Sequence, residues 1–276
     1  MVKKIKKNIN DCIVFLKSLN YKKKEISPPN KYDVGEIYIF IRSWNRPLYL
    51  WACLDNLYRV TKRKCNFILI DNASTDPLVK EIITGFERRG MFKAVHYMER
   101  NHGSNQQLVF SKYRKEMGKY FFLIDSDITI EPNEYCWTDI MIDAAERNKK
   151  LGLLGSYLDT SDFISLKEAQ KLEPNLNDSF LIDLIKLNSN ERRTPPKTDE
   201  IINPFKPAGR LLLANTNVID KVGLPIGNAN LCRAVKAAGY KEGISTRVIH
   251  RHLSLLNIYD YPEYDFKQLK QYLSGK

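Results

Sequence analysis

The stretch Lys119-Tyr-Phe-Phe-Leu-Ile-Asp125-Ser-Asp127-Ile-Thr-Ile130 carries two carboxylates, one residue apart, at the end of an apolar run. Residues 120–124 are continuously apolar, as in a parallel strand that is buried on both faces. An ionised side chain is costly to bury, so Asp125 is expected at the carboxyl end of this strand, where open α/β sheets bind ligands. Alternation places Asp125 and Asp127 on the same side. The stretch therefore predicts an α/β sheet with a divalent-metal site at its edge, and the structural alternative is a polar turn.

Working outward, strand-like and helix-like segments alternate on both sides of this stretch. We expect further strands at 37–41, 66–70, 93–98, 151–157, 210–215 and 246–250. Helices are expected at 48–60, from 77 toward Arg89, at 104–117 and at 230–238. Alternation of this kind is typical of a parallel sheet with helices on both faces. Residues 159–207 are polar and show only weak helical periodicity, so no helix or strand is assigned there.

Length and composition favour one large domain in a reducing compartment. The chain has 276 residues and five scattered cysteines without a C-x-x-C pair, which is typical of reduced thiols in a cytosolic protein. No apolar run approaches the roughly 20 residues that a membrane-spanning helix needs. We therefore expect a cytoplasmic protein, with peripheral contact at the inner face of a membrane as an added expectation.

The positive charge is concentrated at the N-terminus. Residues 1–24 carry eight lysines and one aspartate, out of a net charge of +12 for the whole chain. Apolar residues at helical spacing predict a basic amphipathic helix there: Ile5, Ile9, Cys12, Ile13, Leu16 and Leu19. Such a helix can dock on the main domain, lie on an anionic membrane or contact nucleic acid. We expect this helix and a linker in residues 1–31, the main domain in 36–252 and a tail in 253–276.

Five motifs in order resemble the family 2 glycosyltransferases of the GT-A fold. They are Ile39-Phe-Ile-Arg-Ser-Trp-Asn-Arg-Pro47, Leu69-Ile-Asp-Asn-Ala-Ser-Thr-Asp76, Arg100-Asn-His-Gly103, Leu123-Ile-Asp-Ser-Asp127 and Leu231-Cys followed by Ala238-Gly-Tyr240. The resemblance implies a Rossmann-like, mainly parallel sheet flanked by helices. It also implies an enzyme that moves a sugar from a nucleotide-sugar donor to an acceptor hydroxyl.

The resemblance also assigns roles to residues at the strand ends. Trp44 falls where a ring can lie against the nucleotide base, with packing as the alternative. Asp76 is expected to cap the next helix, and His102 to make a local hydrogen bond. The residues implied to bind the nucleotide sugar are Ser43, Trp44, Asn45, Asp71, Asn72, Asn101, Gly103, Asp125 and Ser126.

A metal site is implied by Asp125, Asp127 and a histidine near the end of the domain. In Val248-Ile-His-Arg-His252, His250 is the first choice as a further ligand. His252 lies on the same side by alternation, so the sequence does not separate the two. Carboxylate and diphosphate oxygens favour Mn²⁺ or Mg²⁺ as the cation.

One departure from the family pattern concerns the catalytic base. Inverting relatives carry an acid in the run that corresponds to Gly227-Asn-Ala-Asn-Leu-Cys232, and here Asn228 occupies that position. An amide cannot act as a general base. The enzyme therefore lacks the contribution of general base catalysis from this position, which is roughly 10² to 10⁴ in rate. The enzyme is then retaining, which we favour, or uses another acid such as Asp159 or Asp162, or binds a nucleotide sugar without turnover. Either aspartate is equally suited to cap a helix.

The expected partners follow from the resemblance and the charge. The donor is a nucleotide sugar, with a UDP-sugar preferred, and the acceptor a cell-surface or lipid-linked glycan. The rival acceptor is a modified DNA base, because a pI near 9.3 also suits nucleic acid. The sequence identifies neither the donor sugar nor the acceptor.

Overall fold

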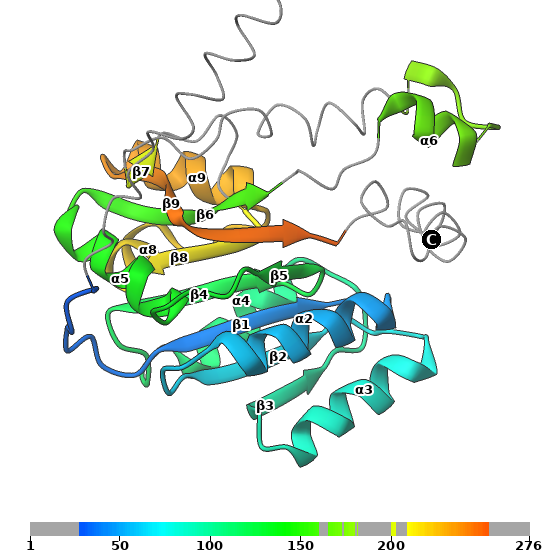
Figure 1. Ribbon diagram of the computed structural model, residues 1–276. Coiled ribbons are helices and arrows are strands. Elements are labelled where there is room, and N and C mark those ends of the chain that lie inside the picture. The colour runs from blue at the N-terminus through cyan, green and yellow to red at the C-terminus, as the bar shows by residue number, and fades with distance from the viewer. Residues whose placement is uncertain are drawn as a thin grey trace, which may run out of the picture.

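The computed structural model describes residues 28–159, 165–172, 174–179, 181, 200–202 and 209–253 (Figure 1). The predicted N-terminal helix, most of the predicted tail and most of the weakly patterned region lie outside these residues. Within the described ranges, no helix is long and apolar enough to cross a bilayer.

The first half of the domain alternates strands and helices as expected. It contains β1 (Tyr38–Ser43), α2 (Pro47–Val60), β2 (Asn66–Asp71), α3 (Pro77–Arg88), β3 (Phe92–Tyr97), α4 (Ser104–Tyr113) and β4 (Tyr120–Asp125). Proline begins both α2 and α3, because its fixed φ suits the first helical turn. The carboxylate of Asp76 accepts from the backbone N–H of Leu78, which confirms the predicted cap. Helix α4 ends at Tyr113, four residues before the predicted end.

The second half is less regular and contains elements that the sequence did not predict. Its elements are β5 (Ile128–Ile130), α5 (Trp137–Arg147), β6 (Leu151–Asp159), α6 (Leu166–Leu172), β7 (Ile201–Ile202), β8 (Leu211–Asn215), α8 (Thr216–Val222), α9 (Asn228–Ala237) and β9 (Lys241–His252). The unpredicted helix α5 is almost entirely buried, although its charged residues recur at helical spacing along one side: Asp139, Asp143, Glu146 and Arg147.

The strands form one mixed sheet in the order β3-β2-β1-β4-β8-β6-β9-β5, and β7 pairs with β9. Strands β3, β2, β1 and β4 are mutually parallel, as predicted. Strand β8 runs antiparallel to both β4 and β6, and β5 runs antiparallel to β9. The parallel arrangement therefore holds for the first half, and the returning strands make the second half mixed.

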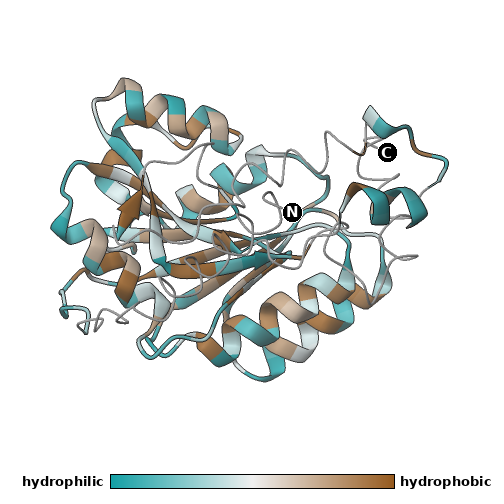
Figure 2. Ribbon diagram, turned by 45° about the horizontal axis from the view of Figure 1, so that its top comes forward, coloured by the Kyte–Doolittle hydropathy of each residue, from teal (hydrophilic) through white to brown (hydrophobic). Residues whose placement is uncertain are grey.

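Two apolar layers cover the sheet, one on each face. Alternation along β1 directs Ile39 and Ile41 into one layer, and Tyr38 and Phe40 into the other. Helices α2, α3 and α5 cover the first layer, and α4, α8 and α9 cover the second, so that α2 lies in front of β1 and β2 in Figure 1 and α4 behind them. Figure 2 shows the hydrophobic strands enclosed by helices with hydrophilic outer faces.

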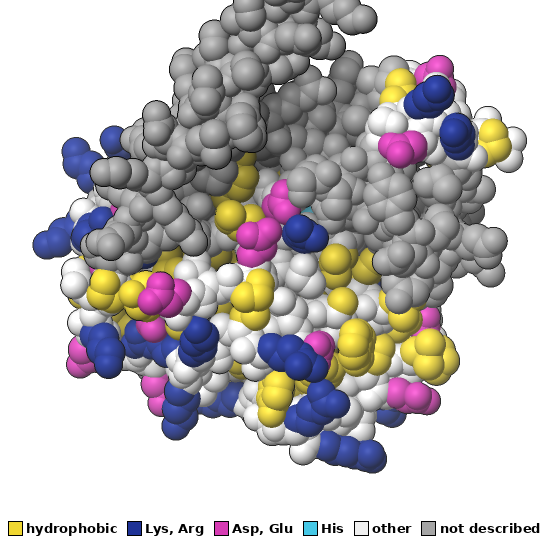
Figure 3. Space-filling model, in the orientation of Figure 1, with side chains coloured by type: hydrophobic (Ala, Val, Ile, Leu, Met, Phe, Trp, Pro, Cys, Tyr) yellow, Lys and Arg dark blue, Asp and Glu magenta, His cyan; other side chains and the backbone are white. Residues whose placement is uncertain are grey.

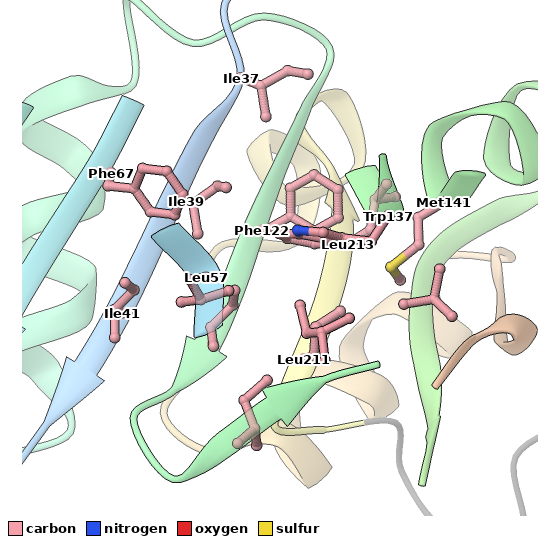
Figure 4. Packing of buried hydrophobic residues seen from close by; sticks show 14 of the residues in the cluster. Ile37, Ile39, Ile41, Leu57, Phe67, Phe122, Trp137, Met141, Leu211 and Leu213 are labelled. Atoms are coloured by element: carbon pink, nitrogen blue, oxygen red, sulfur yellow. The ribbon is translucent and has the colours of Figure 1, made fainter. Parts of the chain in front are cut away.

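Trp137 of α5 is at the centre of the first layer. Its ring meets that of Phe122 edge-on at a centroid distance of 4.8 Å, and its indole N–H donates to Thr61 Oγ1 at 3.0 Å. Figure 4 shows Trp137 beside Phe122 and Leu213, with Met141 of the same helix nearby. This packing holds β4 and β8 against α5, and so fixes the strand that ends at Asp125.

Candidate functional site

The parallel strands end level with one another and bring three predicted motifs together. In the β1–β2 register Ser43 lies opposite Asp71, and in the β1–β4 register Arg42 lies opposite Asp125. Beyond these ends is a cleft of about 290 Å³, which we call the strand-end cleft. Its lining includes residues predicted from sequence to bind metal or nucleotide sugar: Ser43, Trp44, Asn72, Asn101, Gly103, Asp125, Ser126 and Asp127. The lining also includes residues that the sequence did not single out: Arg42, Arg46, Gln106 and Arg210.

Asp125 and Asp127 have different environments at the cleft. Asp125 is the last residue of β4 and accepts from Arg42 Nε at 3.1 Å and from Arg42 Nη2, both at the same carboxylate oxygen. Asp127 lies in the two-residue turn between β4 and β5. Its Oδ2 accepts from Arg46 Nη1 at 2.9 Å, and its Oδ1 is buried without a hydrogen-bond partner.

His252, rather than His250, contacts the carboxylates. His252 Nε2 lies 3.1 Å from Asp127 Oδ2, because β9 pairs with β5 so that His252 is opposite Ile128, the residue after Asp127. His250 is two residues earlier, and its Nδ1 is 2.7 Å from Ser156 Oγ of β6. The other ring nitrogen of His250, Nε2, is buried without a hydrogen-bond partner. His252 is thus the histidine that contacts Asp127, and both histidines stay candidate ligands.

The electrostatics of this pair follow from burial and the arginines. Burial by itself would raise the pKa of Asp127, but the neighbouring His252 and Arg46 outweigh it and hold that pKa well below its ordinary range. Burial lowers the pKa of His252, and Asp127 opposes this shift while Arg210 reinforces it. Near neutral pH the site therefore presents an ionised carboxylate, the form in which Asp coordinates metals.

These residues fit a divalent cation in part. A carboxylate oxygen without a hydrogen-bond partner and an imidazole nitrogen next to the same carboxylate are suitable ligands for Mn²⁺ or Mg²⁺. In the part of the chain that the structure describes, no three His, Cys, Asp or Glu side chains gather closely enough to hold a metal. Asp127 and His252 are thus two candidate ligands, and a cation there would need further oxygen ligands from a substrate or water.

The loop after β2 is held by its own side chains. Asp71 is 5% exposed and accepts from the hydroxyl and the backbone N–H of Ser74, and burial raises its pKa. Asn72 Oδ1 accepts from Asn105 Nδ2 at 2.8 Å. Asn45, predicted to bind the nucleotide sugar, instead accepts from the backbone N–H groups of residues 75 and 76. Asn45 therefore ties the first loop to the second, and the cleft is lined by its neighbours.

Gly103 makes the closest approach at the opposite wall of the cleft. A Cβ at this position would lie 2.4 Å from Cγ2 of Ile226, which is far inside van der Waals contact. Ile226 directly precedes Gly227 and Asn228 at the start of α9. The absence of a side chain at Gly103 thus permits contact between the loop before α4 and the loop before α9.

Comparison with known proteins agrees with this geometry. Residues 38–202 match the protein family described as Glycosyl transferase family 2. The chain belongs to this family. A comparison with curated proteins finds no match.

Solved structures with the same fold include three that contain a nucleotide and Mn²⁺. The structure of GalNAc-T7 with UDP, GalNAc and Mn²⁺ matches at a TM-score of 0.54 and 14% identity, over 80% of this chain and 44% of that one. The mannosyltransferase PcManGT from Pyrobaculum calidifontis, with GDP-Man and Mn²⁺, matches at 0.52 and 12%, over 95% and 69%. Glucosyl-3-phosphoglycerate synthase from Mycobacterium tuberculosis, with Mn²⁺, UDP and glucosyl-3-phosphoglycerate, matches at 0.50 and 10%, over 82% and 78%. The likeness shows a GT-A fold, and this chain spans less than half the length of GalNAc-T7.

The two described candidates for a catalytic base in this family 2 domain, Asn228 and Asp159, do not line the cleft. Asn228 is the first residue of α9 and is partly exposed. Asp159 ends β6 and accepts from Arg251 Nε at 3.1 Å. Arg251 and His252 are consecutive in β9, so their side chains point to opposite faces, and Asp159 lies on the face away from His252. Asp162 lies outside the described residues.

The arginines of the cleft were missed because their partners are distant in the sequence. Arg42 and Arg46 belong to the first motif, in which only Ser43, Trp44 and Asn45 were assigned a role. Each arginine contacts a carboxylate more than 80 positions away in the chain. Arg210 precedes β8, has a left-handed φ of 61°, and contacts His252 Nε2. The sequence signal that could have pointed to Arg42 and Arg46 is the presence of two basic residues in a motif expected next to the metal site.

Proposed function

We propose that this chain is a metal-dependent glycosyltransferase that moves a sugar from a nucleotide-sugar donor to an acceptor hydroxyl. The observation that carries the proposal is the strand-end cleft, where Asp127 Oδ2 lies 3.1 Å from His252 Nε2 at the carboxyl end of a parallel sheet. Membership of glycosyl transferase family 2 supports the same reaction. Solved structures with the same fold that hold UDP or GDP-Man with Mn²⁺ support a nucleotide sugar as the donor.

The nucleotide half of the donor fits the part of the cleft nearest β2. Asp71 ends β2, where its carboxylate can accept from a base or ribose, and Asn72 supplies a hydrogen-bonding amide beside it. Trp44 lines the same cleft and offers a ring face to the base. Asn101 and Gly103 line the other wall. A UDP-sugar is our preferred donor.

Asp127 and His252 hold the metal in this proposal, and Asp125 is the third candidate. When bound, Mn²⁺ or Mg²⁺ neutralises the charge that develops on the leaving diphosphate. Arg46 and Arg210 line the same cleft and can bind phosphate oxygens directly, since guanidinium groups match phosphate geometry. The residues of the chain thus bind, orient and neutralise the donor.

We propose a retaining reaction because Asn228 stands where inverting relatives carry the acid that acts as catalytic base. In such a reaction the acceptor oxygen bonds to the anomeric carbon on the face from which the diphosphate leaves. The sugar–phosphate bond breaks, and a diphosphate oxygen takes the proton of the acceptor hydroxyl. An inverting reaction with Asp162 as base is the alternative, and binding of a nucleotide sugar without turnover is the third.

The acceptor is proposed to be a hydroxyl of a cell-surface or lipid-linked glycan. On the face seen in Figure 3, the Lys and Arg side chains of the described residues are interspersed with acidic and hydrophobic ones and form no continuous basic band. A duplex DNA acceptor would be favoured by such a band. A steep fall in duplex DNA affinity as the salt concentration rises would instead support the DNA acceptor.

A binding and turnover panel tests the proposal. Thermal shifts are measured with UDP-, GDP-, CMP- and dTDP-sugars, each with Mn²⁺ and each with a chelator as the matched control. A true donor raises the melting temperature by mass action, and more with metal. NMR of the product from that donor then reports its anomeric configuration. Inversion would contradict the retaining reaction, and no shift with any donor would contradict the glycosyltransferase itself.

A further inference from the structure

Two arginines, one in β1 and one in the loop after it, each form an ion pair with one carboxylate of the candidate metal site. Arg42, in β1, uses two nitrogens on a single oxygen of Asp125. Arg46, three residues after the end of β1, donates to Asp127 Oδ2 at 2.9 Å. All four side chains are partly shielded, with exposed fractions between 16% and 29%. The two ion pairs are therefore stronger than those between fully exposed side chains.

Each ion pair occupies one carboxylate oxygen at the candidate metal site, Oδ1 of Asp125 and Oδ2 of Asp127, and leaves Oδ1 of Asp127 without a hydrogen-bond partner. Among the described residues, no three His, Cys, Asp or Glu side chains gather closely enough to hold a metal. A cation that binds through Asp125 Oδ1 or through both oxygens of Asp127 must displace a guanidinium, and a cation on Asp127 Oδ1 alone still meets the positive charge of both arginines. Metal affinity in the absence of donor is thus expected to be low.

Arg46 is built to remain at the cleft when it changes partner. Its backbone has a left-handed φ of 56°, and its guanidinium carbon lies 4.3 Å from the centre of the Tyr49 ring. This stacking fixes the side chain independently of Asp127. A phosphate oxygen is a competing acceptor for the same guanidinium, with equal or better geometry.

We infer that Arg42 and Arg46 exchange partners when the donor binds, so that the donor diphosphate releases Asp125 and Asp127 for the metal. The two arginines are positioning residues in this inference, which rests on the proposed function. Its consequence is that the diphosphate recruits the metal, and that Arg42 sets how weakly the metal binds alone. A metal that bridges protein and diphosphate would couple metal binding to nucleotide binding with or without this exchange of partners. The quantity that tests the exchange is therefore the metal affinity without nucleotide.

Calorimetric titration of Mn²⁺ into the protein without nucleotide provides the test. Arg42→Met removes the guanidinium and should tighten Mn²⁺ binding about tenfold, an effect of about 1.4 kcal/mol. Arg42→Gln is the second variant in case the first does not fold, and should tighten it by a smaller factor. Thermal melts of each variant verify folding.

A double-mutant cycle separates exchange of partners from a simple loss of positive charge. In an Asp125→Asn background there is no masked carboxylate, so exchange predicts that Arg42→Met no longer tightens Mn²⁺ binding. A field effect predicts the same gain in both backgrounds. Arg42→Lys keeps the charge but not the paired contact, and should lie between wild type and Arg42→Met.

The outcomes distinguish this inference from the proposed function. If wild-type protein binds Mn²⁺ with UDP or GDP, but Arg42→Met leaves Mn²⁺ affinity without nucleotide unchanged, the exchange is overturned and the glycosyltransferase stands. An equal gain in the Asp125→Asn background also overturns it. If wild-type protein binds neither nucleotide with Mn²⁺, the proposed function itself fails.

Discussion

Asp127 Oδ2 and His252 Nε2 lie 3.1 Å apart although the residues are 125 positions apart in the chain. The contact exists because β5, which begins one residue after Asp127, pairs antiparallel with the end of β9. A turn residue and a strand residue are thereby held by backbone hydrogen bonds rather than by a flexible loop. Rigid support of this kind is what a metal site requires.

The two histidines of β9 should have separable roles. We expect His252→Ala to weaken Mn²⁺ binding in the presence of UDP by about 10- to 100-fold or more. Losses of about 10- to 100-fold are typical even for residues that only hydrogen-bond to a metal ligand. His250→Ala should leave this affinity within a few-fold, because His250 contacts Ser156 instead. Electron paramagnetic resonance of bound Mn²⁺ measures both. The reverse order would restore His250 as the ligand.

Introducing an acid at Asn228 should not create a catalytic base. If the reaction is retaining, Asn228→Asp changes kcat by less than about tenfold and the product keeps the donor's anomeric configuration. Asn228→Ala is the matched control for loss of the amide. A rise in kcat of about 10² or more in the aspartate variant alone would instead indicate an inverting enzyme with a weakened base.

Gly103→Ala should destabilise the protein through contact with Ile226. The added Cβ would lie 2.4 Å from Ile226 Cγ2, and overpacking of this kind typically costs about 1–3 kcal/mol. Ile226→Ala in the same chain removes that atom and should restore most of the stability. Gly85→Ala is the matched control, since its Cβ meets nothing within 4 Å in helix α3, and it should stabilise by about 0.5–1 kcal/mol. Urea unfolding measures all four proteins.

Asp71→Asn should separate nucleotide binding from stability. Burial raises the pKa of Asp71 in the folded state, so its ionisation opposes folding as the pH rises from the unfolded-state pKa through the folded-state pKa. The neutral amide removes this cost and can still accept from Ser74. We expect the unfolding free energy at neutral pH to change by less than about 1 kcal/mol.

The affinity of Asp71→Asn for UDP should nevertheless fall about tenfold, because a charged acceptor makes stronger hydrogen bonds than an amide. Ser74→Ala is the control for the loop, and should lower stability with a smaller effect on UDP. Unchanged UDP affinity in Asp71→Asn would remove this residue from the nucleotide site.

The parallel half of the sheet could be predicted because each of its strands and helices has a local sequence signal. Residues 120–124 are continuously apolar, Pro47 and Pro77 begin helices, and Asp76 caps one of them. Helix α5 was not predicted, although its charged residues recur at helical spacing and so offered a local signal: Asp139, Asp143, Glu146 and Arg147. Asn45 was placed correctly at the first loop, but its hydrogen bonds to the next loop depend on how two strands pair.

Local sequence was enough to predict carboxylates after a buried strand, and histidines at positions 250 and 252 on one side of another strand. The pairing of strands in the folded sheet selects which histidine meets Asp127, because alternation repeats every two residues and only strand register separates two such positions. It also decided that Arg42 and Arg46 reach those carboxylates. Ion pairs of this kind form between chain segments that only the folded sheet brings together.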